Sequence, residues 1–142
     1  MKKIVQKTIK KSYANWRPTR AIRCYHYAAA FDNNKMIEFA WNNPITLDAK
    51  AFKIGQKFNI KNFKEYPFLH AESHLISKLL HRYNTIRSDW SMVILRINRN
   101  GRILLSKPCK KCQKIIDALD ISKVYWSVDN DTFESHNGIL KI

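Results

Sequence analysis

The spacing of apolar positions predicts a helix over residues 2–16. Apolar side chains recur there at intervals of three and four residues and so share one helical face: Val5, Ile9, Tyr13 and Trp16. Lysines occupy the opposite face. The Arg-Pro pair at 17–18 ends the helix, because proline disfavours helical backbone in the residue before it. We therefore expect residues 1–17 to form a basic amphipathic helix.

The same periodicity predicts two more helices. They run from about His70 to Tyr83 and from Pro108 to about Leu119. Proline suits the first position of a helix, because the amide hydrogen that it lacks would find no acceptor there. Pro108 is therefore expected to be the first helical residue of the third helix.

Shorter apolar stretches predict five strands. They are the segments 21–31, 36–41, 90–97, 124–128 and 138–142. With the helices they give the order αββαβαββ, which predicts an α/β fold with one mixed five-stranded sheet and helices packed on it. Nine residues separate Val128 from Gly138, too few for a parallel crossover. We therefore expect the last two strands to be antiparallel.

The composition is that of a folded protein. The chain has 142 residues, of which 45% are hydrophobic and 12% aromatic, and this predicts a single domain over residues 1–142. No apolar run reaches the roughly 20 residues of a membrane span, and the basic N-terminus lacks the apolar core of a secretory signal peptide. We expect a cytoplasmic or intracellular protein that has no membrane partner.

The charge balance favours a polyanionic partner. Lys and Arg number 26 against 11 Asp and Glu, a formal net charge of +15, and such a field attracts nucleic acid. The alternative is a lysine-rich surface that serves solubility. In the segment 43–69 lysines alternate with aromatic residues, a combination suited to single-stranded DNA or RNA. The candidate contacts there are Lys50, Lys53, Lys57, Lys61, Lys64, Phe58 and Phe63. These phenylalanines could equally be core residues beneath a solvated loop.

Two of the three cysteines form a C-x-x-C pair at the start of the third predicted helix. Cys109 and Cys112 lie on its apolar stripe, so both thiols are expected to point inward. With Cys24 the count is odd, which argues against a disulfide framework. The two cysteines are therefore expected to be either a pair of zinc ligands or a redox pair.

The second predicted helix carries an acid within its apolar arc. A carboxylate such as Glu72 is costly to bury unless it is paired with a partner or has a chemical role. The alternative is that Glu72 is a solvated acid, which the dipole favours in the first turn of a helix. His74 and His81 fall on the polar face, where we expect exposed or nucleic-acid-facing side chains. A closed structural zinc site of His70, His74 and both cysteines is a further alternative.

The pattern HAE at 70–72, followed after 35 residues by PCKKC at 108–112, resembles the cytidine deaminase superfamily. The resemblance implies that His70, Cys109 and Cys112 hold Zn²⁺ and that Glu72 is the general acid/base. In this family water activated by the zinc attacks carbon 4 of cytosine, and the glutamate passes protons to the ring nitrogen and to the departing ammonia. A three-layer cytidine-deaminase-like fold follows from the same resemblance.

The resemblance extends from about Ile22 to the end of the chain. The family's G-x-N becomes Ala40-Trp41-Asn42, which implies a sugar contact at Asn42, and Ala71 and Pro108 fall at substrate-binding positions. The antiparallel end of the sheet is similar to the branch of cytidine deaminases and bacterial toxin deaminases. This favours cytosine over adenine as the target base.

Three functions follow as hypotheses. The first is a zinc-dependent hydrolytic deaminase that converts cytosine to uracil in single-stranded nucleic acid. The second is a deaminase of free cytidine, deoxycytidine or deoxycytidylate. The third is a non-catalytic, zinc-stabilised nucleic-acid-binding module, which would have no use for Glu72 as a proton carrier. Small cytidine deaminases often form dimers or tetramers, so the resemblance also allows an oligomer.

Overall fold

The structure, a computed structural model, describes residues 1–20, 22, 24–42, 57 and 70–142. These residues contain helices α1 (Lys2–Asn15), α3 (Ala71–Tyr83) and α4 (Lys110–Ala118). The strands are β1 (Cys24–Asp32), β2 (Lys35–Trp41), β3 (Ser91–Asn98), β4 (Ile103–Leu104), β5 (Lys123–Ser127), β6 (Thr132–Ser135) and β7 (Gly138–Lys141). Among the described residues no helix is both long enough and apolar enough to cross a membrane.

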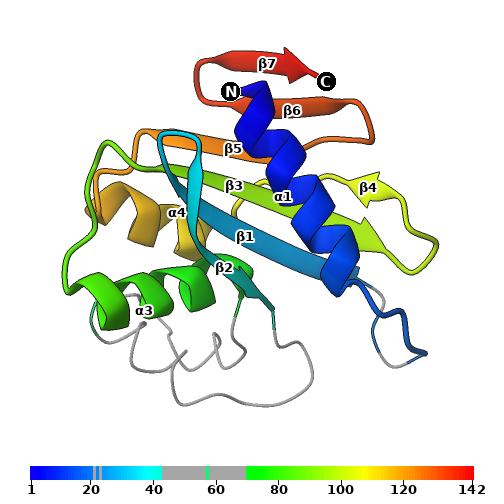
Figure 1. Ribbon diagram of the computed structural model, residues 1–142, viewed down its shortest axis with the longest axis horizontal. Helices are drawn as coiled ribbons and strands as arrows, with labels where there is room; N and C mark the ends of the chain where they lie inside the picture. The colour runs from blue at the N-terminus through cyan, green and yellow to red at the C-terminus, as the bar shows by residue number, and fades with distance from the viewer. Residues whose placement is uncertain (21, 23, 43–56, 58–69) are drawn as a thin grey trace.

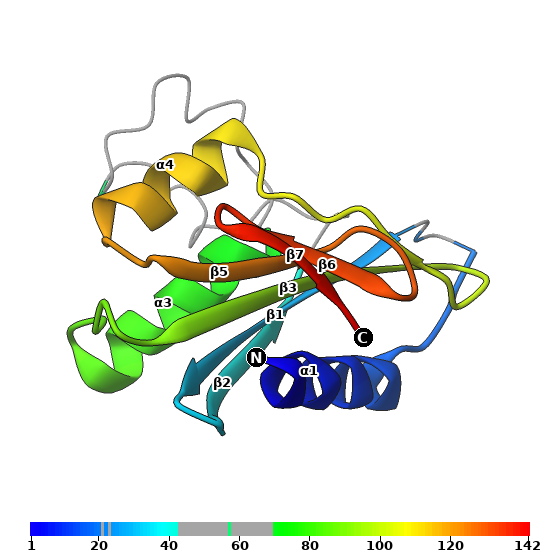
Figure 2. The same ribbon diagram turned by 90° about the horizontal axis from the view of Figure 1, so that it is seen from above.

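The elements form three layers, with α1 on one face of a mixed sheet and α3 and α4 on the other (Figures 1 and 2). The strand order is β2-β1-β3-β5-β6-β7, and β4 pairs with β3 outside this path. The β3–β5 pair is parallel and is connected through α4, whereas the other pairs are antiparallel. The predicted α/β architecture, a mixed sheet with helices packed on it, is confirmed.

In the part of the chain that the structure describes, the sheet has seven strands, so the prediction of five is wrong. The additional strands are β4, which has two residues, and β6, which has four. Both are too short to show an alternating pattern in the sequence. This end of the sheet is antiparallel, because β6 pairs antiparallel with both β5 and β7. The expectation that the segments 124–128 and 138–142 are antiparallel to each other is wrong, because β6 lies between them and β5 and β7 therefore run in the same direction.

The starts of α3 and α4 differ from the prediction by one or two residues. His70 and Cys109 are the N-cap residues, with extended backbone, and the helices begin at Ala71 and Lys110. Pro108 therefore precedes the N-cap and is not the first helical residue. The reason is that the Cys109 sulfur accepts a hydrogen bond from the Cys112 backbone N–H, which makes Cys109 itself the cap.

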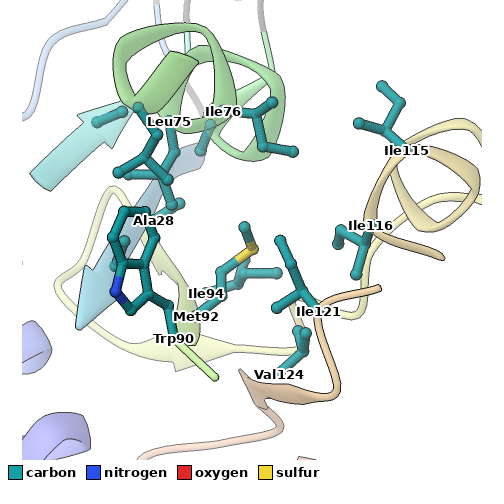
Figure 3. Close-up of a cluster of buried hydrophobic side chains, with 14 of the residues drawn as sticks. Ala28, Leu75, Ile76, Trp90, Met92, Ile94, Ile115, Ile116, Ile121 and Val124 are labelled. Carbon is teal, nitrogen blue, oxygen red and sulfur yellow. The ribbon is translucent and has the colours of Figure 1, made fainter. Parts of the chain in front are cut away.

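Alternating side chains of β1 separate two hydrophobic clusters, one on each face of the sheet. Small side chains face α3, where Ala28 and Ala30 pack with Leu75 and Ile76 (Figure 3). Large side chains, including Phe31, face α1. Because alanine occupies little space, α3 packs close to the sheet at this point, and its N-terminus is fixed there.

The predicted apolar face of α1 is only partly the buried one. Val5 is buried, and three other members of that face are partly buried against the core: Ile9, Tyr13 and Trp16. The face of α1 that is buried against the sheet is rotated relative to the predicted one and is centred on Ile4, Val5 and Thr8. Thr8 is tolerated there because its hydroxyl donates to the Ile4 carbonyl at 2.8 Å.

Candidate metal centre and active site

The N-termini of α3 and α4 bring three candidate metal ligands together. His70 Nδ1 lies 3.8 Å from Cys109 Sγ and 3.6 Å from Cys112 Sγ, and all three ligand atoms lie within 4.8 Å of one another. Zinc bonds of about 2.0–2.3 Å place neighbouring tetrahedral ligands roughly 3.5–3.8 Å apart. One imidazole and two thiols at these distances could hold a metal ion, and this donor set suits zinc.

The environment of Cys109 favours the thiolate form. A hydrogen bond from the Cys112 side chain lowers the pKa of Cys109 to about 4; burial opposes this, while His70 and the Cys112 backbone N–H act with it. The thiolate is the form of cysteine that binds metals. Both thiols point toward His70, in line with the expected inward orientation, although the Cys109 residue is exposed and Cys112 is buried.

A cavity of about 380 Å³ opens beside these ligands. It is lined by His26, Asn42, His70, Ala71, Glu72, Arg96, Leu105, Ser106, Lys107 and Cys109. Five parts of the chain contribute: β1, the end of β2, β3, the start of α3 and the segment between β4 and α4. Of the seven residues predicted for catalysis, metal binding or substrate binding, five line the cavity, namely Asn42, His70, Ala71, Glu72 and Cys109. Pro108 is buried next to Cys109 and is not among the residues that line it.

Glu72 is buried in the first turn of α3 and lines this cavity. Its residue is 6% exposed, so it is not the solvated first-turn acid that the sequence also allowed. Burial raises the pKa of the Glu72 carboxyl, and its own backbone N–H and His70 oppose this shift. A carboxyl group therefore lines the same cavity as two of the three candidate ligands, His70 and Cys109.

Asn42 is fixed to the first strand at the mouth of the cavity. Its side-chain oxygen accepts from the His26 backbone N–H at 3.0 Å, and its backbone N–H donates to the His26 carbonyl at 3.1 Å. Because the carboxamide oxygen is engaged in this way, the amide NH₂ is the group that can donate into the cavity.

Two basic residues of the cavity wall were not predicted from the sequence. His26 and Arg96 are register partners on β1 and β3. Burial lowers the pKa of His26 to about 4, with a smaller effect of Arg96, so its imidazole is neutral at neutral pH. The signal for His26 was a polar residue inside an apolar strand, CYHYAAAF. Arg96 donates to Cys24 Sγ at 2.8 Å, which holds the guanidinium beside the cavity.

His74 does not join the metal ligands. Its Nδ1 lies 2.8 Å from the Trp41 carbonyl oxygen, and because a carbonyl can only accept, Nδ1 carries the proton. His74 is also not a member of the ligand group found among the described residues, so the closed zinc site that included it is not supported. The expectation of an exposed side chain is wrong for His74, which is partly buried, and correct for His81.

The contact of His74 is one of a row of contacts, here called the stripe, in which side chains along α3 hydrogen-bond to backbone carbonyls of the edge strand β2. Lys78 donates to the Phe39 carbonyl at 2.9 Å, and Arg82 donates to the Ile37 carbonyl at 3.0 Å. Four helical residues rise about 6 Å, close to the roughly 6.7 Å of two strand residues, so every fourth side chain meets an alternate carbonyl. The stripe blocks pairing of another strand along this edge and fixes the end of β2, where Trp41 and Asn42 lie.

The basic and aromatic segment 43–69 lies outside the described residues except for Lys57. Lys57 is exposed. The predicted contacts at Lys50, Lys53, Lys61, Lys64, Phe58 and Phe63 therefore stay predictions.

Comparisons with known proteins give a structural likeness and no sequence match. No protein-family model matches the chain, and no curated protein sequence matches it. The solved structure of cytidine deaminase from Mycobacterium leprae is similar, with a TM-score of 0.48 and 14% sequence identity over 97% of this chain and 89% of that chain. At this score and identity the comparison says nothing about activity, and the chemistry has to be inferred from the site residues themselves.

Proposed function

We propose that the protein is a zinc-dependent hydrolytic deaminase that converts cytosine to uracil, with cytosine in single-stranded nucleic acid as its preferred substrate. The observation that carries the proposal is that a His-Cys-Cys ligand set borders a cavity that is also lined by a buried carboxyl group. Hydrolytic deamination needs both, because water must be made nucleophilic and protons must be moved to the leaving amine.

The residues of the cavity divide these tasks. His70, Cys109 and Cys112 would hold the zinc, which when bound lowers the pKa of water toward neutrality. Glu72 accepts the proton that the attacking water releases and delivers it to the ring nitrogen N3 of cytosine. Glu72 next takes the remaining proton of the hydroxyl that is now bonded to carbon 4 and passes it to the exocyclic amine. The bond from carbon 4 to the amine breaks, ammonia leaves, and the ring carbon keeps the oxygen as a carbonyl. Cytosine and water thus yield uracil and ammonia.

The number of ligands favours catalysis over a purely structural metal site. A structural zinc site is normally closed by four protein ligands, whereas a catalytic site keeps one position for water or substrate. Among the described residues the ligand group has three members, and it borders a cavity. A non-catalytic zinc-stabilised module would have no use for the buried carboxyl of Glu72, whose burial is costly.

The charge of the chain supports a nucleic-acid substrate. The net charge is +15, and Arg96 and Lys107 line the cavity itself. Counterion release would draw a single strand to such a surface. A deaminase of free cytidine, deoxycytidine or deoxycytidylate remains the second candidate, because a volume of about 380 Å³ lies at the small end of ligand pockets and suits one nucleoside unit.

A competition assay tests this proposal. Zinc-loaded protein is mixed with a cytosine-containing single-stranded oligonucleotide, cytidine, deoxycytidine and deoxycytidylate, and mass spectrometry follows each conversion to the uracil form. We expect the oligonucleotide to be converted first. Conversion of the monomers alone would establish a nucleotide deaminase in place of a polynucleotide deaminase, and no conversion of any substrate would reject the deaminase.

A further inference from the structure

A second cavity adjoins the candidate active site. It has a volume of about 310 Å³ and is lined by Asn15, Arg17, Ile22, Tyr25, Tyr27, Trp41 and Asn42. Asn42 lines both cavities, so the two meet at the end of β2. The rest of the second wall comes from the end of α1, the segment that follows it and the large-residue face of β1.

An exposed aromatic ring stands in this wall. Trp41 is 48% exposed, which is unusual for so large an apolar side chain at the end of a strand. Lys78 Nζ lies 5.0 Å from the centroid of its ring, and the His74 ring meets it edge-on with centroids 6.0 Å apart. Because these contacts come from α3, the indole is held in place before any ligand binds, as a stacking platform requires.

A largely buried tyrosine also lines the second cavity. Tyr27 is 3% exposed as a residue, and its hydroxyl is the polar group that it can offer to a ligand. The hydroxyl of its neighbour Tyr25, by contrast, accepts from the Thr19 backbone N–H at 2.6 Å. Burial raises the pKa of Tyr27 to about 12, which keeps this group a neutral donor. A buried polar group in a cavity is satisfied most readily by a ligand or by water.

The charge of the second cavity suits an anion. Arg17 Nη1 donates to the carbonyls of Ala14 and Trp16 at 3.1 and 2.8 Å, which fixes the guanidinium at the end of α1. Its other N–H groups make no hydrogen bond within the described part of the chain. Among the described residues that line the two cavities, Glu72 is the one acid. A guanidinium held in this way is a good donor to a phosphodiester.

We propose that the second cavity binds the nucleotide next to the target cytosine in a single strand. The neighbouring base stacks on Trp41, Tyr27 donates to it, and Arg17 contacts the phosphodiester. The strand crosses from one cavity to the other at Asn42. This inference rests on the proposed function, and it explains why a polynucleotide would be preferred, since a free nucleoside fills the first cavity alone.

Equilibrium binding of labelled oligonucleotides to Glu72→Gln protein tests the second cavity without consuming the cytosine. One oligonucleotide carries intact bases around a single cytosine, and two others carry an abasic site on its 5′ or its 3′ side. We expect one of the abasic strands to bind about 5- to 100-fold more weakly, the effect of losing one base–aromatic stack. Trp41→Ala should weaken the intact strand by a similar factor and should not weaken that abasic strand further.

Two variants serve as controls. Trp41→Phe keeps an aromatic face and should retain most of the affinity, which separates stacking from any general loss of structure. Arg87→Ala removes one positive charge, as Arg17→Ala does, but Arg87 is exposed, pairs with Asp89 and follows the far end of α3. Arg17→Ala should weaken the intact strand clearly more than Arg87→Ala. Equal effects of Trp41→Ala on intact and abasic strands, or of the two arginine variants, would overturn the inference.

Turnover by the wild-type protein tests the proposed function separately. If no cytosine is converted, in deoxycytidine or in any oligonucleotide, the proposed function fails, and the binding pattern alone decides whether the second cavity holds a nucleotide. If cytosine is converted but the oligonucleotide affinity depends neither on the neighbouring base nor on Trp41, the proposed deaminase activity is supported and the second cavity is rejected as its subsite.

Discussion

His26 on β1 lies directly opposite Arg96 on β3, and both residues line the cavity that contains His70 and Cys109. The pair brings a neutral imidazole and a guanidinium to the wall of the candidate active site. Burial, helped by Arg96, lowers the pKa of His26 from its ordinary 6.5 to about 4. The folded state therefore binds a proton at His26 more weakly than the unfolded state does.

This relationship predicts how stability depends on pH. Because the folded pKa of His26 lies below the unfolded value, its contribution is complete above about pH 6.5 and is lost as the pH falls toward 4. At about 1.4 kcal/mol per pKa unit, the loss is at most about 3 kcal/mol. Urea unfolding at pH 7 and pH 4.5 should show a smaller acid destabilisation for His26→Asn than for the wild type. Identical pH profiles would contradict the assignment.

The ligand set predicts how the protein loses zinc. Cys109→Ala should bind zinc more than about 100-fold more weakly. Removing a residue that only hydrogen-bonds to a metal ligand already lowers metal affinity about 10- to 100-fold, and removing a ligand itself should lower it further. Cys24→Ala is the matched control, since it also removes one thiol, but Cys24 is hydrogen-bonded to Arg96 and lies outside the ligand group. Zinc titration with a competing chelator measures both variants. Full occupancy in Cys109→Ala, or equal losses in both, would refute the ligand assignment.

Zinc should also stabilise the fold. A ligand that binds only the folded state raises the free energy of unfolding by mass action, so a chelator should lower the Tm of the wild type. The same chelator should change the Tm of Cys109→Ala far less. Thermal unfolding followed by circular dichroism, with and without chelator, measures these changes in Tm. A wild-type Tm that does not change when chelator is added would contradict the prediction.

Two buried serines fix the segment that leads to Cys109. Ser106 donates to the Ile94 carbonyl at 3.0 Å, Ser127 donates to the Leu104 carbonyl at 2.6 Å, and the two hydroxyl oxygens lie 2.7 Å apart. Ser127→Ala leaves the partly buried carbonyl of Leu104 without this donor, which should cost about 1–3 kcal/mol of stability and weaken zinc binding.

The control for the serine prediction is Ser88→Ala, because Ser88 is exposed in the turn before β3. Urea unfolding and zinc titration of both variants measure the difference. If Ser127→Ala behaved like Ser88→Ala in both measurements, these hydrogen bonds would not support the site.

The candidate ligands could be predicted from the sequence because each comes from a helix start that is marked locally. His70 and Glu72 open one apolar periodic segment, and the C-x-x-C pair of Cys109 and Cys112 opens another. Local pattern determines both helices, and packing of both on the same sheet face then brings their N-termini together. The exact start of α4 was missed because a cysteine N-cap, unlike serine or aspartate, is not a usual helix-start signal.

The remaining cavity wall could not be predicted, because it depends on strand register and on short strands. His26 and Arg96 meet only through the β1–β3 ladder, across 70 residues of sequence. Similarly, Tyr27 and Trp41 share a cavity with Arg17 because α1 packs on that face of the sheet. No local pattern specifies such pairings, since periodicity tells which side chains share a face and not which strand lies alongside.

The measurement that tests the central claim most directly is a parallel assay of wild-type and Glu72→Gln protein. Zinc content, the folded state and the conversion of cytosine to uracil are determined on the same samples. Glutamine has the shape of glutamate but cannot accept the proton, so we expect full zinc occupancy, an unchanged fold and a turnover lowered by at least about 10²-fold. Wild-type protein that binds zinc without converting cytosine, or Glu72→Gln protein that keeps its turnover, would contradict the account.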